Sequence, residues 1–476
     1  MEPCPLALKL IPVQKPPQTK RHCLFFKEKK KMKKNDVLVL TAIDYTEKAQ
    51  AVCKTDNMVV FVSEMMIGEI AEVLILKVNT NVAYGKIQKL LNASPDRVAP
   101  RCPIATQCGG CQLQHMSPSH QLSFKENHVK QLFKRNLDYT EDFDAILGMD
   151  DPWYYRNKSQ VPYEVETNSF GFYRAHSHTI LPFESCFIQS EDSNRILKSI
   201  QDFYQERHLK ADNLKTVLIK KGFKTQELMA ILIVKNTRLP LKEDLTQFLQ
   251  KEYPSLKAIL LNINNREDNV VLGDRYIPLT IHESIQDELS GLKFNISAPS
   301  FFQVNPLQTE KMYGRAINYA ALKKTDTVLD LYCGLGTIAS FAALKAKKVI
   351  GVEVLEQAIE DAKANAELNQ LTNLEWIVGD AASATQTLIE NKQKVDVVIV
   401  DPPRKGLDAV TLEAILTLKP KRLVYVSCDP GTLVRDLKVL QGSYQIEKVG
   451  CVDMFPQTVH VETVTLLKLK TKSKMS

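Results

Sequence analysis

The sequence lacks long hydrophobic runs, a leader-like N-terminus and the cysteine density of a disulfide scaffold. None of its apolar stretches approaches the roughly 18 residues that a membrane helix needs. The first residues show neither an apolar core nor a small-residue cleavage site. The ten cysteines are spread widely along 476 residues, which argues against a disulfide framework. We therefore expect a protein of the cytoplasm, a reducing compartment, with no membrane contact.

The composition is that of an ordinary globular protein, with 44% hydrophobic and 25% charged residues. The length is sufficient for two or three domains, each with its own core. A formal net charge of +7 is modest for a chain of this size, and it indicates a polyanionic partner only weakly.

Four segments differ in pattern. Residues 1–34 are rich in proline and lysine without a hydrophobic period, which predicts a disordered basic tail, either merely solvated or an RNA-binding arm. Residues 35–93 contain short alternating runs at regular spacing, typical of a small OB-like β-barrel. Residues 94–297 mix strand and helix patterns, which predicts an α+β central domain. In residues 298–476 apolar strands alternate with amphipathic helices, so we predict a Rossmann-like α/β domain with a doubly wound parallel sheet, closed by a hairpin of the last two strands.

A cysteine cluster lies in the central segment. Cys102, Cys108 and Cys111 are closely spaced, glycines separate the last two, and Cys186 follows further along the chain. Three close cysteines with a distant fourth suit either zinc or an iron–sulfur cluster, and spacing alone does not separate the two.

A glycine turn in residues 330–337 links an apolar strand to a helix, and the next strand ends in Glu353. This arrangement suits a nucleotide cofactor whose ribose hydroxyls bind the carboxylate, in NAD(P) dehydrogenases and in S-adenosylmethionine (SAM) methyltransferases alike. The turn lacks the full GxGxxG pattern, and a later strand ends in Asp401-Pro402-Pro403. Both features favour a methyltransferase that modifies bases.

Cys428 follows the apolar strand 423–426, and Asp429-Pro430 then reads as the N-cap and first residue of a helix. A thiol beside a helix N-terminus lies near the positive end of the helix dipole, which favours the thiolate. Cys428 is therefore a candidate nucleophile.

Five motifs together resemble the RNA uracil-5 methyltransferases, and the chain from residue 35 resembles their 23S rRNA (uracil-5-)-methyltransferase branch. The motifs are Phe-Phe-Gln-Val-Asn at 301–305, Asp-Leu-Tyr-Cys-Gly at 330–334, Asp-Pro-Pro-Arg-Lys-Gly at 401–406, Tyr-Val-Ser-Cys-Asp-Pro at 425–430 and His-Val-Glu-Thr at 460–463. Asp429 is a small departure, since many members carry asparagine there. Both residue types cap helices well.

The resemblance implies a TRAM domain for the barrel, a SAM-dependent methyltransferase domain at the C-terminus and a [4Fe–4S] cluster on the four cysteines. Because methyl transfer needs no electron, we expect a structural or RNA-positioning role for the cluster. The resemblance also implies SAM contacts from Gln303, Tyr332, Glu353 and Asp401, with Cys428 as nucleophile and Glu462 as base.

The expected chemistry explains these residue types. Addition of a thiolate to uracil C6 makes C5 nucleophilic enough to take the methyl group of SAM, and a base then removes the C5 proton. The target base must leave its stack, and one or two aromatic side chains offset that cost. Phe301 and Phe302 are the candidates, one of which suits the core equally well. Arg404 and Lys405 are candidates for phosphate contacts, and the segment 153–158 for single-stranded RNA.

We therefore predict a monomeric enzyme that makes 5-methyluridine in 23S rRNA. The alternatives are the same chemistry on tRNA, and a non-catalytic RNA-binding iron–sulfur protein. RNA cytosine-5 enzymes fit less well because they carry a second cysteine in the motif that here reads Asp401-Pro402-Pro403-Arg404. Amino-group methyltransferases fit less well because they have an aromatic residue after the two prolines.

Overall fold

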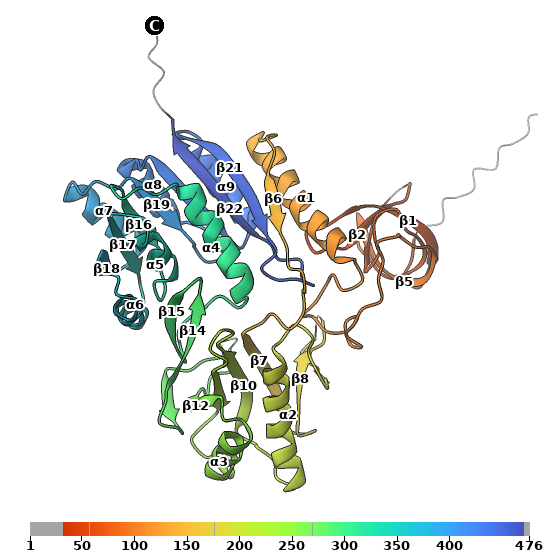
Figure 1. Cartoon of the computed structure of the whole chain (residues 1–476). Helices are drawn as coiled ribbons and strands as arrows, with labels where there is room; N and C mark the ends of the chain where they lie inside the picture. Colours follow the sequence, from red (N-terminus) through yellow and green to blue (C-terminus); the bar gives the residue numbers. More distant parts are fainter. Residues whose placement is uncertain (1–31, 57, 176, 269, 471–476) are drawn as a thin grey trace, which may run out of the picture.

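The computed structural model describes residues 32–470 except 57, 176 and 269. The predicted basic tail lies mostly outside these residues. Figure 1 shows a barrel, a central sheet with helices and a larger C-terminal sheet, which surround a shared junction. No helix in the described ranges is long and apolar enough to cross a membrane.

The barrel prediction is confirmed: five strands close on themselves in the order β1-β2-β3-β5-β4. Alternate residues point inward, and Ala71, Val73 and Ile75 of β4 are fully buried. The strands are β1 (Val37–Tyr45), β2 (Ala51–Lys54), β3 (Val59–Ser63), β4 (Ile70–Val78) and β5 (Val82–Asn92).

The central part is a mixed sheet of seven strands in the order β13-β12-β11-β10-β7-β8-β9. Helices α2 (Glu191–Glu206) and α3 (Lys242–Glu252) contribute buried residues to the core on one face. The strands are β7 (Lys158–Glu164), β8 (Ser169–Tyr173), β9 (Ile180–Pro182), β10 (Leu214–Lys221), β11 (Leu228–Val234), β12 (Leu256–Ile263) and β13 (Arg275–Pro278). Hairpin β14 (Ser284–Leu289) with β15 (Leu292–Ser297) shares a continuous core with this sheet and the C-terminal one.

The C-terminal sheet has eight strands in the order β18-β17-β16-β19-β20-β22-β21-β6, and its first five are parallel. The predicted final hairpin is present, since β21 and β22 pair antiparallel and β22 also pairs with β20. The strands are β6 (Asp144–Leu147), β16 (Thr327–Leu331), β17 (Lys348–Glu353), β18 (Leu374–Val378), β19 (Val397–Val400), β20 (Arg422–Ser427), β21 (Tyr444–Val452) and β22 (Glu462–Leu469).

Helices cover both faces of this sheet, as a doubly wound fold requires. Helices α4 (Pro306–Ala320) and α5 (Thr337–Ala343) contribute to the core on one face. Helices α1 (Pro118–Leu137), α7 (Ala381–Glu390), α8 (Ala409–Leu418) and α9 (Pro430–Leu440) contribute to the core on the other face, and α6 (Glu356–Leu368) contacts β17, β18 and β15.

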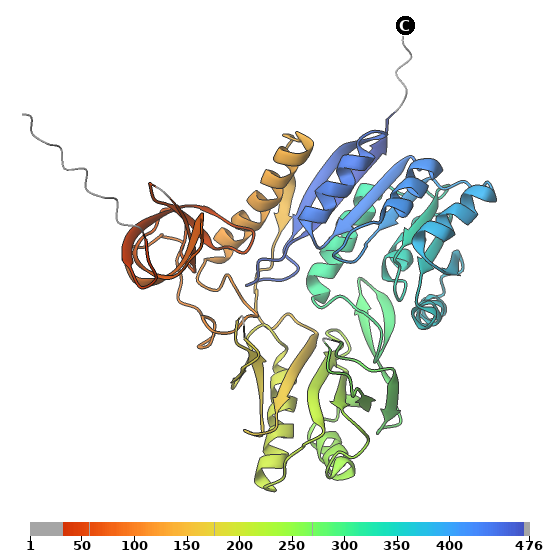
Figure 2. The ribbon, with the colours of Figure 1, turned by 180° about the vertical axis from the view of Figure 1, so that it is seen from behind.

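The chain enters the C-terminal sheet before it builds the central one. Helix α1 and strand β6 fall within residues 94–297, the range predicted for the central domain, yet β6 pairs with β21 at the edge of the C-terminal sheet. Figure 2, from behind, shows α1 alongside this edge. β6 has only four residues, too few for a periodic signal to reveal its partner.

Candidate active site

The candidate residues gather where the parallel strands end. Asp401 follows β19 and Cys428 follows β20, while Glu353 is the last residue of β17. Because β22 is antiparallel, its first residue, Glu462, lies at this same edge. The pairing of Ser427 with Thr463 therefore sets Cys428 and Glu462 opposite each other. Ligands of open α/β sheets bind at this edge.

Cys428 sits at the helix start that the sequence predicts. The Asp429 carboxylate accepts the amides of Gly431 and Thr432 at 2.9 and 3.0 Å, and Pro430 is the first residue of α9. Burial nevertheless raises the pKa of the thiol to about 12, together with the charges of Glu462 and Asp401, while Arg404 lowers it. The expected preference for the thiolate is therefore outweighed before a ligand binds.

Glu462 is 3% exposed. Burial raises the pKa of its carboxyl group to about 8, with a further contribution from Asp401 and an opposing one from Arg404. A carboxylate whose conjugate acid has this pKa is a much stronger base than an exposed glutamate. The charge of Glu462 also raises the pKa of the Cys428 thiol.

Asp401 and Gln303 meet at this site, although 98 residues separate them: Gln303 Nε2 lies 3.4 Å from Asp401 Oδ2. Burial raises the pKa of Asp401 to about 7. The central sheet holds the Gln303 segment in place, because Asn157 Nδ2 donates to the Gln303 carbonyl at 2.9 Å and Lys220 Nζ donates to the carbonyls of Ser297 and Ser300.

Glu353 and Tyr332 have different surroundings. The Glu353 carboxylate accepts backbone amides from Gly334, at 3.2 Å, and from the two residues that follow it. Tyr332 has a positive φ of 67° directly after β16. Its ring packs against the core of α1, α7, α8 and α9, on the opposite face of the sheet from Phe302. Glu353 therefore faces the glycine turn, while much of Tyr332 serves packing.

The glycine turn has a steric reason. Gly336 has a φ of 82°, and a Cβ atom there would lie 2.7 Å from the Trp376 ring. The turn thus passes close to Trp376, and only glycine satisfies both conditions.

Sequence reasoning did not assign a role to Asp330 or Tyr313. Asp330, in β16, is fully buried and neither carboxylate oxygen has a hydrogen-bond partner. Burial, with the nearby Asp401 and Glu353, raises its pKa well above its ordinary value. The buried Tyr313 of α4 lies with its hydroxyl 3.2 Å from Thr337 Oγ1. A buried acid inside an otherwise apolar strand was the available signal for Asp330.

Phe301 and Phe302 differ in their exposure to solvent. Phe301 is 65% exposed, while Phe302 is buried and its ring lies 6.1 Å from that of Phe294. Only Phe301 is free to stack on a base. Arg404 and Lys405 are exposed beside the Asp401 turn.

The structure brings the four predicted metal ligands around one cavity of about 400 Å³, lined by Cys102, Cys108, Cys111 and Cys186. Burial raises the pKa of Cys111 to about 12 and of Cys186 to about 11. Within the described residues, no three histidine, cysteine or acidic side chains are close enough to hold one metal ion.

The aromatic segment 153–158 has both exposed and buried members. The guanidinium of the exposed Arg101 lies over the rings of Trp153, Tyr154 and Phe187, at 5.3, 5.2 and 4.6 Å from their centres. Tyr155 is buried and its hydroxyl donates to the Pro456 carbonyl. The segment thus contributes both to packing and to an aromatic and basic surface.

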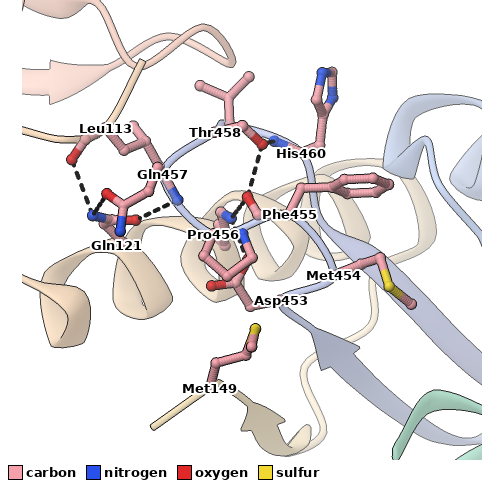
Figure 3. A network of polar contacts seen from close by, with 12 residues as sticks. Leu113, Gln121, Met149, Asp453, Met454, Phe455, Pro456, Gln457, Thr458 and His460 are labelled. Atoms are coloured by element: carbon pink, nitrogen blue, oxygen red, sulfur yellow. Dashed lines mark hydrogen bonds and ion pairs between the residues drawn. The ribbon is translucent and has the colours of Figure 1, made fainter. Parts of the chain in front are cut away.

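Residues 453–460, which we call the base loop, connect β21 to Glu462. Figure 3 shows its polar network, in which Gln121 of α1 meets Gln457 and Thr458 bonds back to the Phe455 carbonyl. The loop contacts α1, the segment that follows Cys111 and the residue before α4.

A doubly wound sheet with a glycine turn, buried carboxyl groups and a cysteine at its carboxyl edge has the architecture of a SAM-dependent methyltransferase. A model of the tRNA (uracil-5-)-methyltransferase family matches residues 117–470, and the chain belongs to this family. It is a SAM-dependent RNA (uracil-5-)-methyltransferase, which confirms the predicted enzyme class and the predicted family.

Curated relatives cover almost the whole chain. An uncharacterized RNA methyltransferase of Clostridium tetani is 43% identical over 92% of this chain and 97% of that protein. Another, from Halalkalibacterium halodurans, is 40% identical over 93% of this chain and 99% of that protein.

A solved structure resembles the whole architecture. The tRNA (uracil-54, C5)-methyltransferase of Pyrococcus abyssi, in complex with S-adenosyl-L-homocysteine, is 26% identical with a TM-score of 0.73, over 90% of this chain and 99% of that chain. That solved enzyme acts on tRNA and matches nearly the whole chain, so the architecture by itself does not distinguish an rRNA substrate from a tRNA substrate.

Proposed function

We propose that this enzyme methylates C5 of uridine in 23S rRNA through a covalent bond between Cys428 Sγ and uracil C6. The observation that carries the mechanism is the placement of Cys428 opposite Glu462 at the carboxyl edge, with Asp401 close enough to affect the pKa of both.

In the first step, Sγ of Cys428 adds to C6 and the electron pair of the C5–C6 double bond moves toward C5 and O4. The thiol must first lose its proton to solvent, and the high pKa of free Cys428 means that bound ligands have to supply the driving force. Asp401 would hold SAM, and the positive charge of a bound sulfonium would favour the thiolate. Arg404 acts in the same direction.

In the second step C5 takes the methyl group, with the C–S bond of the sulfonium breaking behind it. The Glu462 carboxylate then takes the C5 proton, the C5–C6 double bond forms again and the C6–Sγ bond breaks. Burial suits Glu462 to this step because a carboxyl group with a pKa near 8 holds an abstracted proton readily.

Gln303, Glu353 and Asp401 are proposed to hold SAM, with the backbone at Tyr332 forming the turn beneath it. SAM supplies the electrophilic methyl group when bound. The chemistry of the protein groups fits the sulfonium and ammonium groups of SAM, since the buried carboxyl groups of Asp330 and Asp401 belong to β16 and to the turn after β19.

The four cysteines are proposed to hold a [4Fe–4S] cluster. A cluster is larger than a single ion and takes one thiolate on each iron, which suits four sulfurs arranged around a cavity. When bound, it would supply a rigid cross-link between the 102–111 segment and Cys186. Methyl transfer needs no electron, so we give the cluster a structural or RNA-positioning role.

Two RNA substrates are supported by different observations. The five motifs and the cysteine set resemble the 23S rRNA branch. The second candidate is tRNA, favoured by the likeness to a solved enzyme that acts on uracil 54 of tRNA.

Methyl transfer from labelled SAM to unmodified 23S rRNA and to an unmodified tRNA pool distinguishes them, with the product nucleoside identified and mapped by mass spectrometry. 5-Methyluridine in rRNA alone supports the proposal, whereas label in tRNA alone moves the substrate and keeps the chemistry. No label in either RNA, with SAM binding intact, would favour the non-catalytic alternative.

A further inference from the structure

The base loop is fixed by a buried ion pair that is separate from the reacting groups. Lys125 of α1 and Asp453 have side chains that are 0% and 5% exposed, and Lys125 Nζ lies 2.5 Å from Asp453 Oδ1. Lys125 Nζ also donates to the Phe455 carbonyl at 3.0 Å. Burial of an unpaired cation costs several kcal/mol of desolvation free energy. Lys125 therefore favours the loop position in which Asp453 and the Phe455 carbonyl lie within hydrogen-bond distance.

A second buried contact lies one helical turn earlier on α1. Gln121, 3% exposed, donates from Nε2 to Gln457 Oε1 at 3.0 Å and accepts the Gln457 amide on Oε1 at 3.0 Å (Figure 3). Gln457 has a positive φ of 71°. A left-handed backbone at a residue other than glycine persists where its surroundings hold it. The amide pair with Gln121 does so here.

Other parts of the chain form hydrogen bonds with the same loop. The amides of Gln112 and Leu113, directly after Cys111, both donate to the Gln457 carbonyl at 3.0 Å. Asn305 Nδ2 donates to the Met454 carbonyl at 3.0 Å. Thr458 and His460 then complete the turn that leads to Glu462, four residues beyond Thr458. Contacts from several segments of the chain therefore hold the loop in one position.

We propose that Lys125 and Gln121 are positioning residues for proton removal: through Asp453 and Gln457 they hold the base loop so that Glu462 reaches C5 of the methylated adduct. This inference rests on the proposed role of Glu462. Helix α1 contributes no group to the reaction. We expect it to affect proton removal from C5, and not thiol addition or methyl transfer.

The experiment uses full-length enzyme and two transcripts of the RNA that is methylated in the substrate assay. One transcript contains uridine and the other contains 5-fluorouridine. Fluorine at C5 leaves no proton to remove, so every enzyme that adds Cys428 and transfers the methyl group stays covalently attached to it. On the uridine transcript, only an enzyme with a slow base step accumulates the adduct, which denaturing gel electrophoresis detects.

Three variants are compared with wild type. Lys125→Met/Asp453→Asn removes the ion pair, Gln121→Met removes the amide pair without any change of charge, and Glu462→Gln is the reference for a lost base. The matched control is Arg422→Met/Asp326→Asn. That pair is also largely buried, at 14% and 8% exposure and 2.6 Å, and its arginine also donates to backbone carbonyls, but it lies at the opposite end of β20.

We expect the Lys125/Asp453 variant to release product about 10²-fold more slowly, the cost of a displacement of about 1 Å, and the Gln121 variant to be slowed in the same step. Both should accumulate adduct on uridine RNA and react at the wild-type rate with 5-fluorouridine RNA. The Arg422/Asp326 control should accumulate none.

Equal loss of reaction on both transcripts, or no adduct on uridine RNA while Glu462→Gln accumulates it, would overturn the positioning role. If Glu462→Gln itself accumulates no adduct, the proposed base is wrong, and that failure is distinct. Should Lys125→Met/Asp453→Asn not fold, Gln121→Met decides the question alone.

Discussion

Replacement of Glu462 by glutamine is expected to change how the stability of the ligand-free enzyme depends on pH. The folded state raises the pKa of Glu462 from 4.5 to about 8, chiefly because the side chain is buried. A raised pKa means that folding favours the neutral carboxyl group. The stabilisation is fully present below pH 4.5 and is lost as pH rises through about 8.

The magnitude follows from the same values. At about 1.4 kcal/mol for each pH unit, the interval from 4.5 to about 8 corresponds to up to about 5 kcal/mol in the free energy of unfolding. Glutamine is neutral at every pH and has nearly the same shape. The variant should therefore match wild type near pH 5 and be more stable by several kcal/mol near pH 9.

Urea unfolding of both proteins between pH 5 and pH 9 measures this difference. Glu447→Gln is the control, because Glu447 lies at the surface of β21 in an exposed pair with Lys468. Its stability should follow that of wild type across the range. A difference between Glu462→Gln and wild type that is constant with pH would refute the argument that Glu462 is buried as a neutral acid.

Three further outcomes are expected. Cys428→Ala should abolish methyl transfer and leave binding of S-adenosyl-L-homocysteine, measured by calorimetry, within about twofold, since the thiol makes a bond to RNA and not to the cofactor. SAM affinity should rise with pH through about 7, as Asp401 gains its negative charge, and Asp401→Asn should weaken binding and flatten this rise. Cys111→Ser should abolish the visible absorbance of protein purified without oxygen, whereas Cys53→Ser, at a buried barrel cysteine, should retain it. Colourless wild-type protein under those conditions would contradict the cluster.

Local patterns predicted the parts of the site that depend on neighbours in sequence. The end of the strand before Cys428, the Asp429 cap and the Gly336 turn all follow from residues a few positions apart. The pairing of β20 with β22, which sets Cys428 opposite Glu462, could be expected only through the motif resemblance.

Those local patterns could not predict burial and contacts that depend on residues distant in sequence. The helix start at Asp429 predicted a thiolate at Cys428, but the raised pKa depends on how much protein covers the thiol and on two acids, Glu462 of β22 and Asp401 just after β19. Nothing in the sequence distinguished exposed Phe301 from buried Phe302. The contact between Gln121 and Gln457 spans 336 residues, and neither residue belongs to a motif.

The early entry of α1 and β6 into the C-terminal sheet has a consequence for folding. Their partners in that sheet, above all β21, are translated about 300 residues later. Until then the apolar face of α1, with Val129 and Phe133, has no final partner. Closure of such distant contacts is slow and exposes the intermediate to aggregation. A growing chain can complete its barrel early, but it cannot complete the part of the molecule that carries Glu462 until synthesis is almost finished.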